Sequence, residues 1–169
     1  MSQEFLSVDP KSLNENVFTL IGKEWTLITA GTLEAYNTMT ASWGGLGILW
    51  NKNVCTIYVR THRYTREFLE KNNTFTLSFF DDSWRSALNL CGSKSGRDVD
   101  KAAETGLIPV EGQHGAVYFE QARLVLECRK LYYQDLEPEH FLDPEIHKMY
   151  PLKDYHRVYI GEILSVLKK

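Results

Sequence analysis

Three short segments of the sequence combine hydroxyl groups, glycines and cations in ways that core packing does not require, and two of them could hold an anionic ligand. The first is Arg60-Thr61-His62-Arg63-Tyr64-Thr65-Arg66, where a strand is expected to give way to a helix. Guanidinium groups donate paired hydrogen bonds, hydroxyl groups add single donors, and the free amides of a helix N-terminus favour negative charge. This segment therefore predicts a phosphate site, with an ordinary solvated basic turn as the alternative.

The second segment is a glycine-containing loop, Cys91-Gly92-Ser93-Lys94-Ser95-Gly96-Arg97-Asp98-Val99-Asp100-Lys101. Its glycines allow the backbone to fold around an anion, and its serines, lysines and arginine can donate hydrogen bonds or supply charge. The spacing differs from that of a Walker A loop. The loop predicts further contacts to a phosphate, and a flexible loop before a helix is the alternative.

The third segment, Asn37-Thr38-Met39-Thr40-Ala41-Ser42-Trp43-Gly44-Gly45, is polar and strand-like and leads into two glycines. Short polar side chains and accessible backbone amides suit the edge of a flat heteroaromatic ligand, because each can pair with one ring carbonyl or nitrogen without blocking stacking. The alternative is a polar strand that runs into a turn.

Other catalytic and metal-binding patterns are missing from the sequence. His140 and His147 are seven residues apart, and neither Cys-x-x-Cys nor His-Glu-x-x-His occurs, so no metal site is predicted. The sequence also lacks Gly-x-Ser-x-Gly and Gly-x-Gly-x-x-Gly. Cys91 lies in a cationic loop that could lower its pKa, with a small buried thiol as the alternative. Cys55 and Cys128 fall on apolar faces and are expected in the core.

The elements expected to position these segments are mostly strands. Alternation of apolar and polar residues predicts strands over 55–60, 74–79, 122–129 and 157–167. Weaker signals of the same kind cover residues 18–21 and 26–29.

Helical signals are short and few. They predict one helix from Thr65, a second after Ser83, and a third over residues 98–104 that ends at Gly106. Because strands outnumber helices and do not alternate regularly with them, the sequence predicts an antiparallel barrel with short helices in its connections. Residues 138–151 are expected to form an ordered surface excursion before the last strand.

Length and composition describe an ordinary globular chain. Its 169 residues fit a single domain, residues 1–169, which can bury a sizeable core without disulfides or a structural metal. The net charge of −3 predicts no whole-surface attraction for nucleic acid or for an anionic membrane. A start without a signal-peptide pattern, the absence of a long apolar run and three widely separated cysteines indicate a cytoplasmic protein.

At these same residues the sequence resembles the flavin reductase-like family of FMN-binding split barrels, in particular its flavoredoxin-like branch. The resemblance rests on residues 37–44, 60–66, 75–80 and 91–101 and on the ending Tyr155-His156-Arg157-Val158-Tyr159-Ile160-Gly161-Glu162-Ile163. In this ending the histidine lies five residues before a Gly-Glu pair, as in the last strand of the family. The motifs occur in the family's order and cover nearly the whole chain.

The resemblance implies a mainly β fold, an antiparallel Greek-key split barrel that forms a homodimer and binds FMN in a groove near the subunit interface. The implied lining of the isoalloxazine ring comprises Asn37, Thr38, Met39, Thr40, Ala41, Ser42 and Trp43. The residues implied along the ribityl phosphate are Arg60, Arg63, Tyr64 and Thr65. Those implied to complete the grip are Cys91, Gly92, Ser93, Lys94, Ser95 and Lys101. His156 is the implied catalytic residue, on the nicotinamide or substrate side.

Two departures from the family pattern concern the nicotinamide. The chain has Leu49-Trp50-Asn51-Lys52-Asn53 where typical members carry a Pro-Pro pair, and Asp154-Tyr155 in place of Gly-Asp before the histidine. The implied function is an FMN-dependent oxidoreductase that takes electrons from NADH or NADPH and passes them to a flavin or another acceptor. The alternatives are an electron carrier reduced by a protein donor and a flavin-binding module without turnover.

Overall fold

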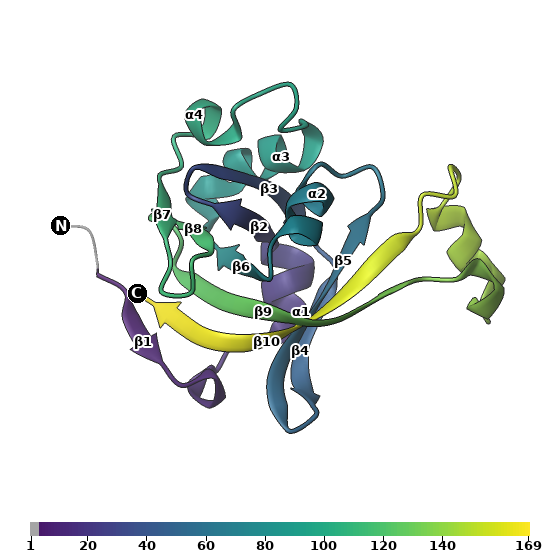
Figure 1. Cartoon of the computed structure of the whole chain (residues 1–169), viewed down its shortest axis with the longest axis horizontal. Helices are drawn as coiled ribbons and strands as arrows, with labels where there is room; N and C mark the ends of the chain where they lie inside the picture. The colour runs from purple at the N-terminus through teal and green to yellow at the C-terminus, as the bar shows by residue number, and fades with distance from the viewer. Residues whose placement is uncertain (1–3) are drawn as a thin grey trace.

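The computed structural model describes residues 4–169 and consists mainly of antiparallel strands joined by short helices (Figure 1). Eight strands form one sheet: β1 (Leu6–Val8), β2 (Thr26–Thr32), β3 (Ala35–Ala41), β4 (Gly44–Leu49), β5 (Lys52–Arg60), β6 (Thr74–Phe79), β9 (Leu124–Asp135) and β10 (His156–Lys168). A separate hairpin contains β7 (Pro109–Glu111) and β8 (Val117–Phe119). The predicted mainly β fold class is confirmed.

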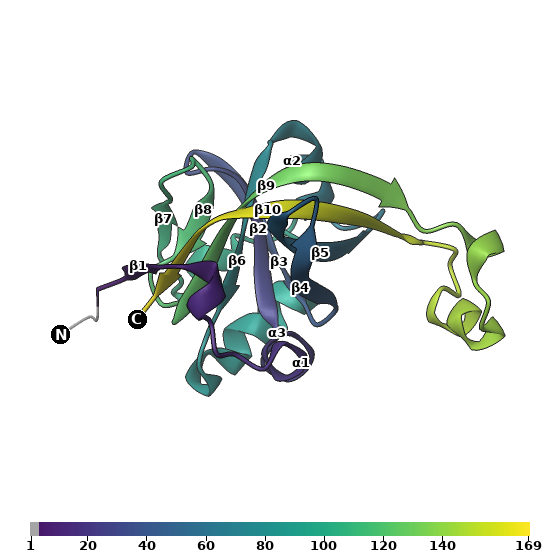
Figure 2. The same cartoon turned by 90° about the horizontal axis from the view of Figure 1, so that it is seen from below.

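The strands at the two ends of the sheet are consecutive in the sequence. Neighbouring strands follow the order β3-β2-β6-β9-β10-β5-β4, and β1 pairs with the last residues of β10. β3 and β4 are therefore the edge strands, although only Ser42 and Trp43 separate them in the chain. Figure 2 shows the strong twist of the sheet from below.

Four short α-helices occupy connections within residues 4–169: α1 (Val17–Thr19), α2 (Thr65–Lys71), α3 (Arg85–Ser93) and α4 (Lys101–Thr105). α4 begins later than predicted, because the Asp100 side chain caps it by accepting a backbone hydrogen bond. It ends as predicted at Gly106, which has a φ of 75°. α3 follows a 3-10 turn whose cap is Asp81 and not Ser83.

The strand predicted over residues 18–21 is wrong. This stretch belongs to α1 and to a π-helical turn, Leu20–Glu24, that follows it. Asn16 caps the helix, since its side-chain oxygen accepts hydrogen bonds from the amides of Phe18 and Thr19. Phe18 is 90% exposed while Leu20 and Ile21 are buried together, so the apolar residues follow a helical spacing and not an alternating one.

The core packs against both faces of the sheet, because alternate residues of a strand point to opposite sides. On β2, Leu27 belongs to one buried cluster and Ile28 to the other. Cys55 and Cys128 lie in the larger cluster, as predicted. Cys91 of α3 lies in the second cluster, which packs between the sheet and the α3 and β7–β8 connections.

The connection between β9 and β10 projects from the barrel as an arm, residues 136–155 (Figures 1 and 2). It contains two 3-10 turns, Pro138–His140 and Pro144–Met149. The ring of Phe141 stacks on that of Tyr150 with centroids 5.8 Å apart, and Tyr155 packs against both rings. The excursion expected over residues 138–151 is therefore a folded element held by its own aromatic cluster.

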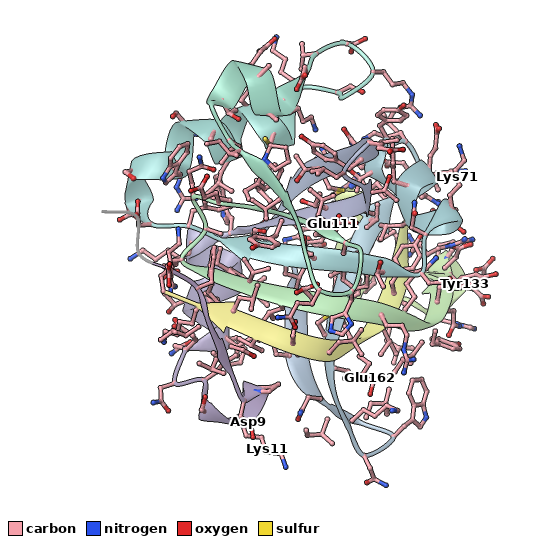
Figure 3. All side chains as sticks on the ribbon, turned by 60° about the vertical axis from the view of Figure 1, so that its left-hand side comes forward. Asp9, Lys11, Lys71, Glu111, Tyr133 and Glu162 are labelled. Atoms are coloured by element: carbon pink, nitrogen blue, oxygen red, sulfur yellow. The ribbon has the colours of Figure 1, made fainter. Side chains whose placement is uncertain are left out.

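The outer face of β10 carries ion pairs between strands. Glu162 lies there (Figure 3), and its carboxylate accepts hydrogen bonds from Lys52 at 2.8 Å and from Arg129. These pairs tie β10 to β5 and β9, its two main neighbours. These three residues line none of the cavities described below, so their role is to stabilise the sheet.

Candidate functional site

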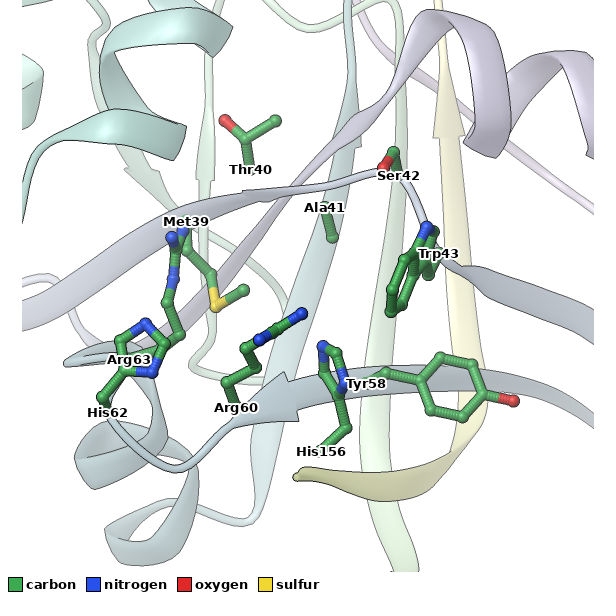
Figure 4. A pocket seen from close by; sticks show the side chains of 10 residues that line it. All are labelled: Met39, Thr40, Ala41, Ser42, Trp43, Tyr58, Arg60, His62, Arg63 and His156. Atoms are coloured by element: carbon green, nitrogen blue, oxygen red, sulfur yellow. The ribbon is translucent and has the colours of Figure 1, made fainter. Parts of the chain in front are cut away.

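Residues 39–43 and the adjoining ends of β5 and β10 enclose a main cavity of about 400 Å³ (Figure 4). Its lining residues are Met39, Thr40, Ala41, Ser42, Trp43, Tyr58, Arg60, His62, Arg63 and His156. The volume falls in the range of roughly 300–1,000 Å³ typical of ligand pockets. Segments far apart in the sequence meet here because β10 pairs with β5, which places His156 opposite Arg60.

A small cavity of about 160 Å³ lies beside the main cavity. Its lining residues are Asn37, Met39, His62, Arg63, Tyr64, Thr65, Ser93, Lys94, Ser95, Gly96 and Lys101. Met39, His62 and Arg63 line both cavities, so the two share a wall. The three segments singled out in the sequence therefore converge on one pair of cavities.

Two cations, the buried Lys101 and the partly buried Arg63, lie at the small cavity with hydrogen-bond donors that the described part of the protein does not use. The ammonium group of Lys101 donates to the carbonyls of Thr38 at 2.7 Å and Cys91 at 2.9 Å, which uses two of its three protons. Arg63 donates from Nη1 to the carbonyl of Gly92 at 2.9 Å, while its buried Nη2 has no hydrogen-bond partner within residues 4–169. An anion in the small cavity would complete both sets of hydrogen bonds.

Burial disfavours the charged forms of Lys101 and Arg63. It lowers the pKa of Lys101 to about 8 and also lowers the pKa of Arg63, which feels the positive charge of Arg60 as well. No Asp or Glu lines either cavity within the described chain. A bound anion would offset this unfavourable charge, so the site favours phosphate-like groups over cations.

Arg60 lines the main cavity, but the arm engages its guanidinium group. Nη1 donates to the Asp154 carboxylate at 2.9 Å, and Nη2 donates to the carbonyl of Met149 at 3.0 Å. The guanidinium carbon also lies 5.0 Å from the centre of the Tyr150 ring. The hydrogen bond from Arg60 lowers the pKa of Asp154. Arg60 therefore holds the arm against the cavity rim.

His156, the first residue of β10, is buried at the other end of the main cavity. Its Nδ1 lies 2.7 Å from the hydroxyl of Tyr150, and its ring centre lies 5.1 Å from that of Trp43. Figure 4 shows the ring directed between Arg60 and Trp43. Burial and the nearby positive charge of Arg60 lower the pKa of His156 to about 4, so the imidazole is neutral at pH 7.

Cys91 is a free, buried thiol. The sequence left open whether this thiol is activated by the cationic loop or is simply a small buried side chain. Burial raises the pKa of the thiol to about 11, although Lys101 and Arg63 act in the opposite direction. The structure supports the small buried thiol and not a thiol activated by the cationic loop, because loss of hydration outweighs the nearby charges.

Two other classes of site receive no support from the structure. No group of three or more His, Cys, Asp or Glu side chains within residues 4–169 is arranged to hold a metal ion. No helix in that part of the chain has the length and hydrophobicity needed to cross a membrane.

A model of the flavin reductase like domain matches residues 19–168. The chain belongs to this family. A search of curated proteins finds no match. The family match contains all the segments that line the two cavities.

Solved structures show the same fold in this flavin reductase-like chain. The flavoredoxin of Methanosarcina acetivorans is 23% identical, with a TM-score of 0.68 over 96% of this chain and 76% of the other. An FMN-binding domain of a flavin reductases-like enzyme from Shewanella baltica is 18% identical, with a TM-score of 0.71 and coverages of 99% and 78%. The Streptomyces globisporus NADH:FAD oxidoreductase SgcE6 is 19% identical, with a TM-score of 0.64 and coverages of 86% and 75%. The predicted split-barrel fold is confirmed.

Three of the residues predicted to contact a cofactor in this flavin reductase-like protein lie behind the cavity walls. Thr38, Cys91 and Gly92 line neither cavity. Their carbonyl groups instead accept the hydrogen bonds that hold Lys101 and Arg63 in place. The side chain of Thr38 is also used elsewhere, at 2.8 Å from the hydroxyl of Thr29.

Several predicted donors are also already engaged. The hydroxyl of Thr40 donates to the carbonyl of Leu88, and Figure 4 shows it pointing away from Arg60. Ser93 donates to Asn89 at 2.8 Å. At the start of α2, the amides of Arg66 and Glu67 donate to the preceding turn, so they are not the free amides expected there.

Thr65 lies inside α2 and does not cap it. The N-cap position is Tyr64, which makes no capping hydrogen bond through its side chain. The buried hydroxyl of Thr65 instead accepts a hydrogen bond from Asn37 Nδ2 at 2.8 Å. This bond joins β3 to α2 at the floor of the small cavity.

Sequence reasoning missed Tyr58, His62 and Gly96 as lining residues. Tyr58 lies two residues before Arg60 on β5, so strand alternation alone puts both side chains on one face. Gly96 is required for packing, since a Cβ atom there would lie 1.9 Å from Asn37 Oδ1. No local signal identifies this close approach, because Asn37 is on a distant strand.

Proposed function

We propose that the protein is an FMN-dependent oxidoreductase that takes electrons from NADH or NADPH and passes them to a flavin or another acceptor. The observation that carries the proposal is the pair of adjoining cavities. One is lined by the buried Lys101 and the partly buried Arg63, which have donors unused by the described residues, and the other by residues 39–43 and His156. The family match and the names of the FMN-binding and NADH:FAD oxidoreductase structures support it.

The residues present fit FMN. Arg63 and Lys101, with Ser95 and Lys94 beside them, would hold the phosphate in the small cavity. Residues 39–43 and His156 would bound the isoalloxazine ring in the main cavity. A phosphate supplies the acceptors that the buried Nη2 of Arg63 and the third proton of Lys101 lack.

Bound FMN would supply the electron and hydride chemistry, and the chain would supply position and electrostatics. His156 is neutral at pH 7, so it offers one nitrogen as a hydrogen-bond donor and the other as an acceptor. Because Tyr150 engages Nδ1, the remaining nitrogen is the one available to a ligand. His156 would orient the electron donor or acceptor at the ring.

Absorbance spectroscopy and anaerobic titration test the proposal. We expect the protein to retain or take up FMN with a visible flavin spectrum, and NADH or NADPH to bleach it without oxygen. Bleaching by neither nicotinamide would overturn the reductase assignment. Absence of FMN binding would overturn the cofactor assignment as well.

A variant pair tests the phosphate site directly. Replacing Arg63 and Lys101 together by Ala should weaken FMN binding by at least about a hundredfold, since two charge-assisted contacts of roughly 1.5–3 kcal/mol each are lost. Arg66→Ala is the matched control, because Arg66 lines neither cavity. Circular dichroism establishes folding, and equal FMN affinity in the double variant would refute the assignment.

A protein electron carrier is a second candidate function. The observation in its favour is that Asp154 and Met149 use donors of Arg60, which leaves less free charge at the main cavity for the diphosphate of a nicotinamide nucleotide. A carrier would hold FMN and exchange electrons with a redox protein, but would not oxidise NADH or NADPH. The same anaerobic titration separates the two functions.

We also propose that the protein is a cytoplasmic homodimer. Apolar side chains exposed at the end of β4 and in the turn after it, Ile48, Leu49 and Trp50, offer a surface for a second copy. The three cysteines are free thiols, which suits a reducing compartment. Sedimentation analysis tests the oligomeric state, and cell fractionation tests the location.

A further inference from the structure

A third hollow of about 700 Å³, the apolar groove, lies next to the main cavity. One wall is the α1 region over residues 17–22, another is the start of β4, and Leu136 and Tyr150 contribute from the arm. The groove is thus built from elements that contribute nothing to the small cavity.

The apolar groove has no charged side chain in its lining within residues 4–169. The main cavity, by contrast, contains the guanidinium groups of Arg60 and Arg63. A charged ligand in the groove would lose hydration without gaining an ionic partner, whereas an apolar ligand would gain from burial. The main cavity therefore suits a charged ligand, and the neighbouring groove suits an uncharged one.

One wall of the groove is also a wall of the main cavity. Ser42, Trp43, Tyr58 and His156 line both spaces. Figure 4 shows the Tyr58 ring extending away from Arg60, with its hydroxyl at the far end. No hydrogen bond engages that hydroxyl within the described residues, so a ligand in the groove can meet this polar group beside the apolar side chains of the lining.

We propose that the apolar groove binds an uncharged, flat, mainly apolar ring compound that carries one hydrogen-bonding group. Trp43 and Phe18 offer aromatic surface, and Tyr58 and Ser42 offer the polar contact. The shared wall would place the compound beside the flavin ring, where it could be a substrate. This substrate role rests on the proposed function. The binding itself stands on the groove alone.

Calorimetry with two matched naphthalene compounds tests the charge selection. 1-Naphthamide is neutral and 1-naphthoate is its anionic counterpart, so they differ little except in charge. We expect naphthamide to bind the full chain at least about tenfold more tightly, because the groove offers no partner for a carboxylate. Equal affinities, or no naphthamide binding, would overturn the proposal.

Two glycines provide a matched pair of variants that locates the binding. A Cβ atom at Gly22 or at Gly47 meets nothing within 4 Å, so a side chain can leave the backbone at either position without a clash at its first carbon. Gly22 lines the groove and Gly47 does not. Gly22→Phe should fill the groove and weaken naphthamide binding at least about tenfold, while Gly47→Phe leaves it unchanged. Equal affinities in the two variants would contradict the location.

The measurements are made with and without FMN, which keeps the two proposals separate. Naphthamide binding by a chain that takes up no FMN would retain the groove and remove the flavin function. FMN binding without naphthamide binding would do the opposite. If naphthamide does not bind and Gly22→Phe dissociates a dimer, the groove is covered by a second copy and the proposal falls.

Discussion

The hydroxyl of Tyr150 lies 2.7 Å from Nδ1 of His156, and both side chains are buried. Tyr150 belongs to the projecting arm, whereas His156 begins the strand that crosses the barrel. Through Tyr150, the arm therefore contacts a residue that lines the main cavity. Through this one contact, a surface excursion fixes the orientation of the histidine at the candidate site.

Replacing Tyr150 by Phe should release the histidine ring while keeping most of the aromatic packing. In the native protein, the hydrogen bond between the Tyr150 hydroxyl and Nδ1 favours one tautomer of the neutral imidazole over the other. We expect nitrogen NMR of His156 to show this single tautomer, and Tyr150→Phe to show a mixture. An unchanged spectrum would mean that other contacts fix the ring.

The depressed pKa of His156 makes stability depend on pH in a defined window. Between the ordinary value of 6.5 and the folded value of about 4, the unfolded chain binds a proton that the folded chain excludes. The free energy of unfolding therefore falls as the pH drops through this window, by up to about 3 kcal/mol from this group. Denaturant titrations at pH 7 and pH 4.5 should show a smaller fall in His156→Gln than in the native protein. Equal falls would contradict the prediction.

Asp154→Asn should loosen the arm. The change weakens the pair with Arg60, whose side chains are 25% and 12% exposed, and we expect local opening to become easier by about 1–2 kcal/mol. Hydrogen exchange of residues 138–153 should accelerate by about tenfold. Lys148→Ala is the control on the same arm, because its pair with Glu145 is largely exposed and contributes little. Similar exchange in both variants would refute the role of Asp154.

Gly96→Ala should damage the small cavity without touching a cation. The added Cβ would lie 1.9 Å from Asn37 Oδ1, so Asn37 must move and its hydrogen bond to Thr65 is disturbed. We expect about 1–3 kcal/mol of destabilisation, together with weaker FMN binding in a fluorescence titration. Gly47→Ala is the control, since its Cβ meets nothing within 4 Å. Retained FMN affinity in Gly96→Ala would show that the loop can shift.

The thiols should be inert in the native protein. All three cysteines are free and buried, and the pKa of Cys91 is raised to about 11. Ellman's reagent at pH 8 should therefore label the protein slowly, and should find three thiols after unfolding. Rapid labelling of one thiol in the native state would contradict the burial of Cys91.

Local patterns in the sequence predict β2, β5, β6, β9 and β10, whereas the convergence of the three polar segments is what the family resemblance implies. Alternation of apolar and polar residues identifies both β5 and β6, although only β5 buries a single face and β6 is buried on both. It fails over residues 18–21, where Asn16 caps a helix whose apolar residues also fit a short strand. Local patterns also do not predict which residues form hydrogen bonds with Arg60 and Thr65. Asp154 and Asn37 lie on distant segments, and only the fold brings them close.

Ser42 and Trp43 connect the two edge strands without joining any ladder, since pairing of β3 ends at Ala41 and pairing of β4 starts at Gly44. Substitutions at these two positions can reshape the wall between both hollows and leave every strand in register. Ligand preference can thus diverge faster than architecture. The barrel itself persists in solved structures that are only 18–23% identical to this chain.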